Sequence, residues 1–165
     1  MLKRPQFIMG MTVLFLLVFG SICSAAPGVG ITVGKTLPQF TLRSLDGQSI
    51  TVGSSNNITI LNFWTTWCPP CRSEMPELNE FVLQYIDKVT FYAINLSEES
   101  KVVNDFMYTN RYSIPVLLDS DGEVGKLFRI QYIPTTIVVD RNGVIKYRKS
   151  GPVTKTELED VVSRL

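Results

Sequence analysis

The chain has 165 residues, which is enough for one domain with a hydrophobic core and too few for two independent ones. Its 16 basic and 15 acidic side chains are scattered, with no basic stripe of the kind that binds phosphate backbones, so we expect no nucleic-acid partner. The absence of histidine excludes Cys-His and Ser-His-Asp catalysis, histidine-ligated metals and histidine-ligated haem.

Residues 1–26 have the layout of a secretory signal. Lys3 and Arg4 precede an uncharged, mostly apolar stretch from 7 to 23, and the small residues 24–26 follow it. The apolar stretch is at the short limit of a membrane span, so cleavage and retention as a membrane anchor are both open. Either alternative predicts that the rest of the chain is exported, as a secreted or membrane-anchored protein.

The first part of the exported chain combines a linker, a hairpin and a buried strand. The glycine-rich residues 27–36 are expected to form a linker before a single domain at 37–165. Asp46-Gly47 is a strong two-residue turn signal and predicts a hairpin. The two hairpin strands and the buried strand are expected at 40–45, 49–52 and 58–64.

Helices and strands then alternate. Met75, Leu78 and Val82 recur at helical spacing after Pro69 and Pro70, which suit a first helical turn. The later elements are expected as a strand at 89–95, a helix around 102–107, a strand at 116–118, a short helix at 124–128, strands at 135–139 and 144–147, and a closing helix with the capping box Thr154 and Glu157. This order predicts an α/β domain with a mostly parallel sheet, helices on both faces and an antiparallel hairpin at one edge.

Cys68 and Cys71 form a Cys-x-x-Cys pair, and Cys23 is interpreted as a small apolar residue of the leader. A zinc site would need two more soft ligands, which the exported domain lacks, and a structural disulfide would close only a very short loop. We therefore favour thiol-disulfide exchange, with no metal and no cofactor.

The two cysteines are expected to differ in their roles. Cys68 lies at a strand-to-helix junction, where the partial positive charge of the helix N-terminus favours the reactive thiolate. We expect an exposed Cys68 to attack the substrate disulfide and a shielded Cys71 to release the product. For Trp67 two interpretations are open: it flanks the site and contacts substrate, or it fills the end of the strand.

The segment 61–76, LNFWTTWCPPCRSEMP, resembles the active-site segment of ResA/TlpA-type membrane-tethered thioredoxins. The resemblance continues through Tyr132–Thr136, which is similar to the cis-proline loop of the family, and through a strand-helix insert at about 94–118. It implies a thioredoxin fold with a mixed central sheet, an N-terminal hairpin and that insert. It also implies a cis Ile133–Pro134 bond facing the cysteines, with the Ile133 backbone binding substrate.

The same resemblance directs attention to Glu74. Asn62 stands where thioredoxin has a buried aspartate, and an amide cannot relay a proton. In the ResA-like proteins a glutamate three residues after the second cysteine is linked to the active site, and Glu74 occupies that position. Its carboxylate is expected to exchange protons with the thiols. The alternative is an acid that stabilises the start of the helix.

The expected function is the reduction of protein disulfides outside the cytoplasm. The resemblance implies apocytochrome c as the substrate, as in cytochrome c-type biogenesis. Because the compartment is oxidising, we also expect a membrane thiol partner that keeps the domain reduced. A thiol oxidase of secreted proteins is the nearest alternative, since it uses the same cysteines at a different redox potential. Two further alternatives are a soft-metal carrier and a peroxiredoxin-like peroxidase, for which Thr65 fits but Leu61 replaces the required proline.

Overall fold

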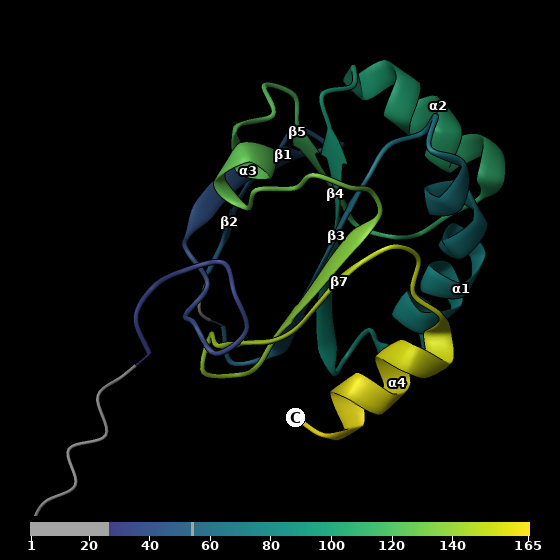
Figure 1. Ribbon diagram of the computed structural model, residues 1–165. Coiled ribbons are helices and arrows are strands. Elements are labelled where there is room, and N and C mark those ends of the chain that lie inside the picture. Colours follow the sequence, from purple (N-terminus) through teal and green to yellow (C-terminus); the bar gives the residue numbers. More distant parts are fainter. Residues whose placement is uncertain (1–26, 54) are drawn as a thin grey trace, which may run out of the picture.

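The computed structural model describes residues 27–53 and 55–165, so the expected leader with Lys3, Arg4 and Cys23 lies outside the described residues. A seven-stranded sheet, in the order β2-β1-β5-β4-β3-β6-β7, lies between two helical layers (Figure 1). The strands are β1 (Phe40–Ser44), β2 (Ser49–Val52), β3 (Ile58–Trp64), β4 (Val89–Leu96), β5 (Val116–Asp119), β6 (Thr135–Val139) and β7 (Ile145–Ser150). The helices are α1 (Pro69–Tyr85), α2 (Ser100–Asn110), α3 (Glu123–Leu127) and α4 (Lys155–Ser163).

The sheet is mixed, as the thioredoxin fold implies. Only β3–β4 and β4–β5 are parallel, whereas β1–β2, β1–β5, β3–β6 and β6–β7 are antiparallel. The expectation of a mostly parallel sheet is therefore wrong. It failed because the N-terminal hairpin joins the sheet antiparallel to β5, and because β6 returns antiparallel along β3. Neither pairing leaves a local signal in the sequence.

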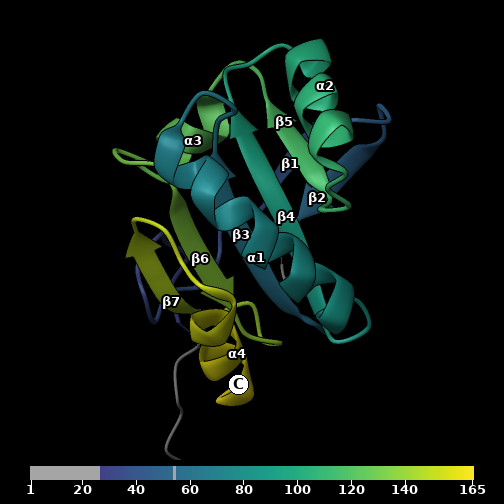
Figure 2. The same ribbon diagram turned by 90° about the vertical axis from the view of Figure 1, so that its right-hand side faces the viewer.

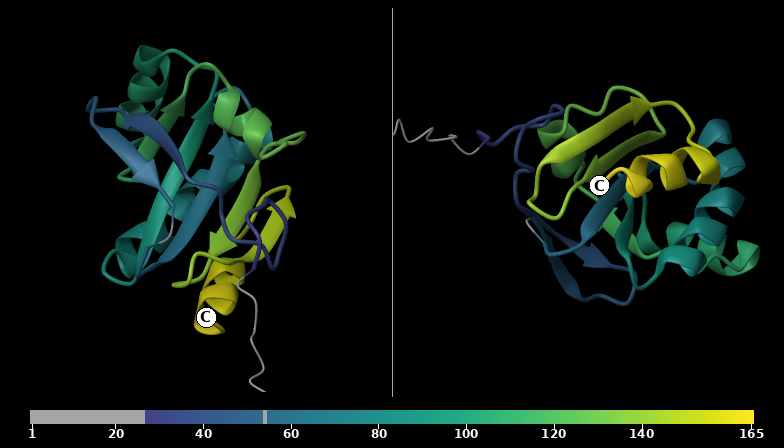
Figure 3. Two further views of the ribbon diagram at one scale, coloured as in Figure 1. Left: turned by 90° about the vertical axis from the view of Figure 1, so that its left-hand side faces the viewer. Right: turned by 90° about the horizontal axis from the view of Figure 1, so that it is seen from below.

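The strand β3 is buried on both faces, and its alternating side chains enter two separate cores. Ile60 and Trp64 join the core under α1, α2 and α4, while Leu61 and Phe63 join the core on the α3 side. Figure 2 shows α1 in front of the central strands, and the two views of Figure 3 show the opposite face and the layers seen from below. The predominantly apolar sequence of β3, interrupted by Thr59 and Asn62, reflects this two-sided burial.

Residues 27–36, expected as a linker, are attached to the edge of the domain. The Gly34 amide donates to the Ile145 carbonyl at 2.8 Å, and the Ile145 amide donates to the Lys35 carbonyl at 2.9 Å. The Leu37 amide donates to Gly143 at 2.8 Å. These bonds occupy backbone groups at the start of β7, which would otherwise be a free edge. Among residues 27–53 and 55–165, no helix has the length and apolar character needed to cross a membrane.

The closing helix α4 begins with half of the expected capping box. The Thr154 hydroxyl accepts from the Glu157 amide at 3.1 Å, as an N-cap does. The Glu157 carboxylate does not return to the Thr154 amide; it accepts from the Tyr147 hydroxyl at 2.6 Å and from Lys149 Nζ at 2.7 Å. The side chains of β7 compete for this carboxylate, and sequence spacing alone cannot reveal such a competition.

Candidate active site

The two cysteines lie where β3 passes into α1, at the carboxyl edge of the parallel strands. Cys68 is the N-cap of α1, and Pro69 and Pro70 are the first two helical residues. The Cys71 amide donates to Cys68 Sγ at 3.3 Å, and the two sulfurs are joined in a disulfide. Because the prolines have no N–H, the Cys71 amide is the first helical donor that can reach this sulfur.

Access to the disulfide is restricted. Cys68 is 3% exposed and Cys71 is 0% exposed, so the expected contrast between an open and a shielded cysteine is small in this disulfide form. Trp67 is 68% exposed, and Trp64 rather than Trp67 fills the end of the strand. Trp67 is thus available to a partner beside the disulfide.

The loop before β6 faces the cysteines, as the resemblance implies. The Ile133–Pro134 peptide bond is cis. Antiparallel pairing of Phe63 with Thr135 brings this loop to the same edge of the sheet as Cys68. The Ile133 carbonyl oxygen lies 3.8 Å from Cys68 Sγ. A backbone acceptor next to the reactive sulfur suits the capture of an extended peptide.

Glu74 lies in the second turn of α1, three residues after Cys71, and is 4% exposed. Its Oε1 accepts from Asn62 Nδ2 at 2.8 Å, and its Oε2 accepts from the Val153 amide at 2.7 Å. Burial raises the pKa of Glu74 to about 7, although the hydrogen bonds from Val153 and Asn62 and the charge of Lys149 oppose the shift. A buried acid of this kind differs from a solvated charge at a helix start.

The setting of Glu74 includes partners that the sequence did not indicate. Asn62 Nδ2 also donates to Thr136 Oγ1 at 3.1 Å, which links the acid to the residue two positions after the cis proline. The Val153 partner is a backbone amide 79 residues from Glu74. A backbone donor has no signature in a sequence, because every residue other than proline supplies one.

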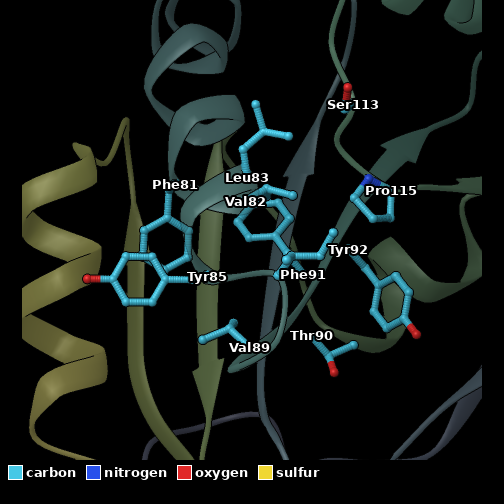
Figure 4. A pocket seen from close by; sticks show the side chains of 11 residues that line it. Phe81, Val82, Leu83, Tyr85, Val89, Thr90, Phe91, Tyr92, Ser113 and Pro115 are labelled. Atoms are coloured by element: carbon cyan, nitrogen blue, oxygen red, sulfur yellow. The ribbon is translucent and has the colours of Figure 1, made fainter.

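The described residues contain little else that suits chemistry. Within residues 27–53 and 55–165, no group of three His, Cys, Asp or Glu side chains is arranged to hold a metal ion. An apolar groove lies between the C-terminal half of α1 and the start of β4, at the far end of the helix from Cys68 (Figure 4). Its lining includes Phe81, Tyr85 and Pro115 and contains no charged side chain and no cysteine, so it offers no thiol for redox chemistry.

Comparison with known proteins agrees with this geometry. Residues 32–165 match the family model "Redoxin". The chain is 34% identical over 125 residues to sporulation thiol-disulfide oxidoreductase A of Bacillus subtilis, covering 73% of this chain and 76% of that protein. It is 32% identical over 135 residues to thiol-disulfide oxidoreductase ResA of Bacillus thuringiensis, covering 81% and 78%. The crystal structure of StoA from Bacillus subtilis superposes with a TM-score of 0.68 at 34% identity, covering 75% of this chain and 96% of that one.

Proposed function

We propose, from the premise that this chain belongs to the redoxin family and is a ResA/TlpA-type thiol-disulfide oxidoreductase, that its Cys68–Cys71 couple reduces protein disulfides outside the cytoplasm. Membership of this family accounts for thiol-disulfide exchange but does not say whether the protein reduces or oxidises its substrates. The direction depends on how strongly the protein stabilises the Cys68 thiolate, because strong oxidants owe their potential to a stabilised reduced form.

The observation that carries the proposal is the scarcity of donors to Cys68 Sγ. Pro69 and Pro70 remove two of the amides that a helix N-terminus would normally offer, which leaves the Cys71 amide at 3.3 Å. No histidine stands between the cysteines, and the nearby Glu74 carboxylate disfavours a second negative charge when it is ionised. Weak thiolate stabilisation supports a low reduction potential.

The proposed reaction moves two electrons from the dithiol to the substrate. The Cys68 thiolate attacks one sulfur of the substrate disulfide, forms a mixed disulfide and releases the other substrate sulfur as a thiolate, which takes up a proton. Cys71 then loses its proton and attacks Cys68 Sγ. The Cys68–Cys71 bond forms, and the second substrate sulfur leaves as a thiolate that is protonated in turn.

Glu74 is proposed as the group that accepts the Cys71 proton. A pKa of about 7 leaves the carboxyl able both to accept and to return a proton near neutral pH. It lies one helical turn after Cys71, on the same side of α1, and both residues are buried. For substrate binding we propose the exposed Trp67, which precedes Cys68 in the chain, and the cis Ile133–Pro134 loop, whose Ile133 carbonyl lies 3.8 Å from Cys68 Sγ.

The partners are proposed from the resemblance and from the redox state of the compartment. Apocytochrome c is the proposed substrate, and a membrane thiol protein is the proposed electron donor, because an oxidising compartment would otherwise trap the disulfide form. Export relies on the leader with Lys3 and Arg4, whose charges favour the cytoplasmic side of a membrane. In cells whose outer barrier has been opened but whose cell membrane is intact, added protease should degrade the domain. Full protection of the domain from protease would exclude export.

The direction of the reaction is tested by a redox titration of Cys68–Cys71 in dithiothreitol and glutathione buffers. A reductant should equilibrate near thioredoxin, at about −270 mV, and far from the strong oxidant at about −120 mV. A value above about −170 mV would overturn the proposal and favour the oxidase.

The division of labour is tested with single cysteine variants. Cys68→Ser should abolish insulin reduction, since it removes the attacking sulfur, while Cys71→Ser should accumulate a mixed disulfide with substrate proteins. Full turnover by Cys68→Ser would mean that the nucleophile is misassigned.

A further inference from the structure

We infer that Glu98, which the sequence did not single out, is a positioning residue for the Cys68 nucleophile. The inference rests on the proposed function. Glu98 Oε2 accepts from the Thr66 amide at 2.7 Å, and Glu98 Oε1 accepts from the Thr66 hydroxyl at 2.5 Å. One carboxylate therefore holds both the backbone and the side chain of a residue two positions before Cys68, in a segment 32 residues away in the sequence.

The sheet brings the two segments together. Parallel pairing sets Asn95 of β4 beside Trp64 of β3, so the two strands end side by side at the edge where α1 begins (Figure 2). After β4, Ser97 adopts a left-handed conformation with φ 55°, and its amide donates to the Asp119 carbonyl at 2.9 Å. This turn directs Glu98 toward the loop between β3 and α1. A left-handed φ is uncommon for a serine, so surrounding contacts must hold it.

Asn95 completes the arrangement. Its Nδ2 donates to Glu98 Oε2 at 2.6 Å, so the carboxylate accepts from three donors on two segments. Asn95 is 1% exposed, and its Oδ1 has no hydrogen-bond partner among the described residues. If the Asn95 amide were flipped, its Oδ1 would lie next to Glu98 Oε2, and the two oxygens would repel each other. Glu98 thus dictates the orientation of a buried amide, and it makes no ion pair within the part of the chain that the structure describes.

The anchored loop has few other restraints. The Cys68 amide donates to the Thr65 carbonyl at a long 3.5 Å, and the Thr65 hydroxyl has no partner among the described residues although it is buried. Trp67, the residue between the anchor and the nucleophile, is 68% exposed. Disulfide exchange needs the attacking sulfur in line with the substrate S–S bond, and small displacements of a reacting group are costly in rate. Releasing Thr66 should therefore slow attack by Cys68.

The test compares Glu98→Ala with the matched control Glu99→Ala, which alters the adjacent exposed acid, a residue that makes no side-chain cap bond to α2. We expect Glu98→Ala to lower kcat/KM for insulin reduction about tenfold or more, the scale for a displaced reacting group, and the control to change it less than twofold. Glu98→Gln should recover part of the rate, because its amide oxygen still accepts from Thr66. Equal rates for Glu98→Ala and wild type would overturn the inference.

A double-mutant cycle distinguishes positioning from general destabilisation. If Glu98 acts through Thr66, adding Thr66→Val to Glu98→Ala should cause no further loss, whereas independent effects would multiply and refute the inference. Fluorescence anisotropy of the reduced protein supplies a second measurement, since Trp64 is buried and Trp67 is the exposed indole. Glu98→Ala should lower the anisotropy of Trp67 under native conditions. An inactive wild type would instead contradict the proposed function.

Discussion

Glu74→Gln should remove a pH dependence of stability that one buried carboxyl creates. In the folded protein its pKa is raised from 4.5 to about 7, with burial as the main cause. The folded state therefore holds the proton more tightly than the unfolded state does. Between about pH 4.5 and 7 the unfolded chain releases this proton first, so stability falls as the pH rises, and above pH 7 the full cost is present.

The magnitude follows from the shift. At 1.36 kcal/mol per pKa unit, the displacement of Glu74 corresponds to about 3 kcal/mol of stability that is present at pH 4 and lost at pH 8. With an m-value of about 2 kcal/mol/M, the urea midpoint of the wild type should fall by about 1.5 M on this account. In Glu74→Gln, this contribution to the change of the urea midpoint with pH should be absent.

The assay is urea unfolding of the oxidised protein at several pH values between 4 and 8. In Glu74→Gln, the NH₂ group of the amide would face one of two donors, Asn62 Nδ2 or the Val153 N–H. This mismatch should lower the stability by a constant amount at every pH. The test is therefore the difference between the variant and the wild type in how stability changes with pH. Glu77→Gln, one turn further along α1 at an exposed position, is the matched control. Its amide oxygen can still accept from the Lys155 amide, as Glu77 Oε2 does at 2.8 Å, so its curve should run parallel to that of the wild type. Parallel curves for Glu74→Gln and wild type would refute the reasoning.

Three further predictions concern stability, measured by urea unfolding at a fixed pH. Phe81→Ala, at a fully buried position of α1, should cost about 3–5 kcal/mol; a loss under about 1 kcal/mol would mean that the core closes around the cavity. Asp119→Ala should cost about 3 kcal/mol, because the buried amides of Val124 and Gly125 lose their acceptor, and Asp119→Asn should retain part of the difference. Thr154→Ala should cost about 1 kcal/mol through loss of the α4 N-cap, and no change would show that the Glu157 amide finds another acceptor.

Local patterns in the sequence were sufficient for most elements of the fold. The predicted strands 58–64 and 135–139 agree residue for residue with β3 and β6, because both are short segments rich in β-branched and aromatic residues, which favour a strand. The spacing of Cys68 and Cys71 after such a segment, followed by two prolines, located the redox pair at the N-terminus of α1. These features depend on neighbours in the chain, which is why periodicity and turn chemistry reveal them.

Only the tertiary structure decided what surrounds the cysteines. The antiparallel return of β6 brings Ile133 to Cys68, and the parallel end of β4 brings Glu98 to Thr66. Burial of the Glu74 carboxyl beside Asn62 of β3 and the Val153 amide raises its pKa. Each of these contacts joins residues that are distant in the sequence or involves a backbone group, so no local pattern records it. Burial and charge then follow from strand order, which is a property of the whole folded chain.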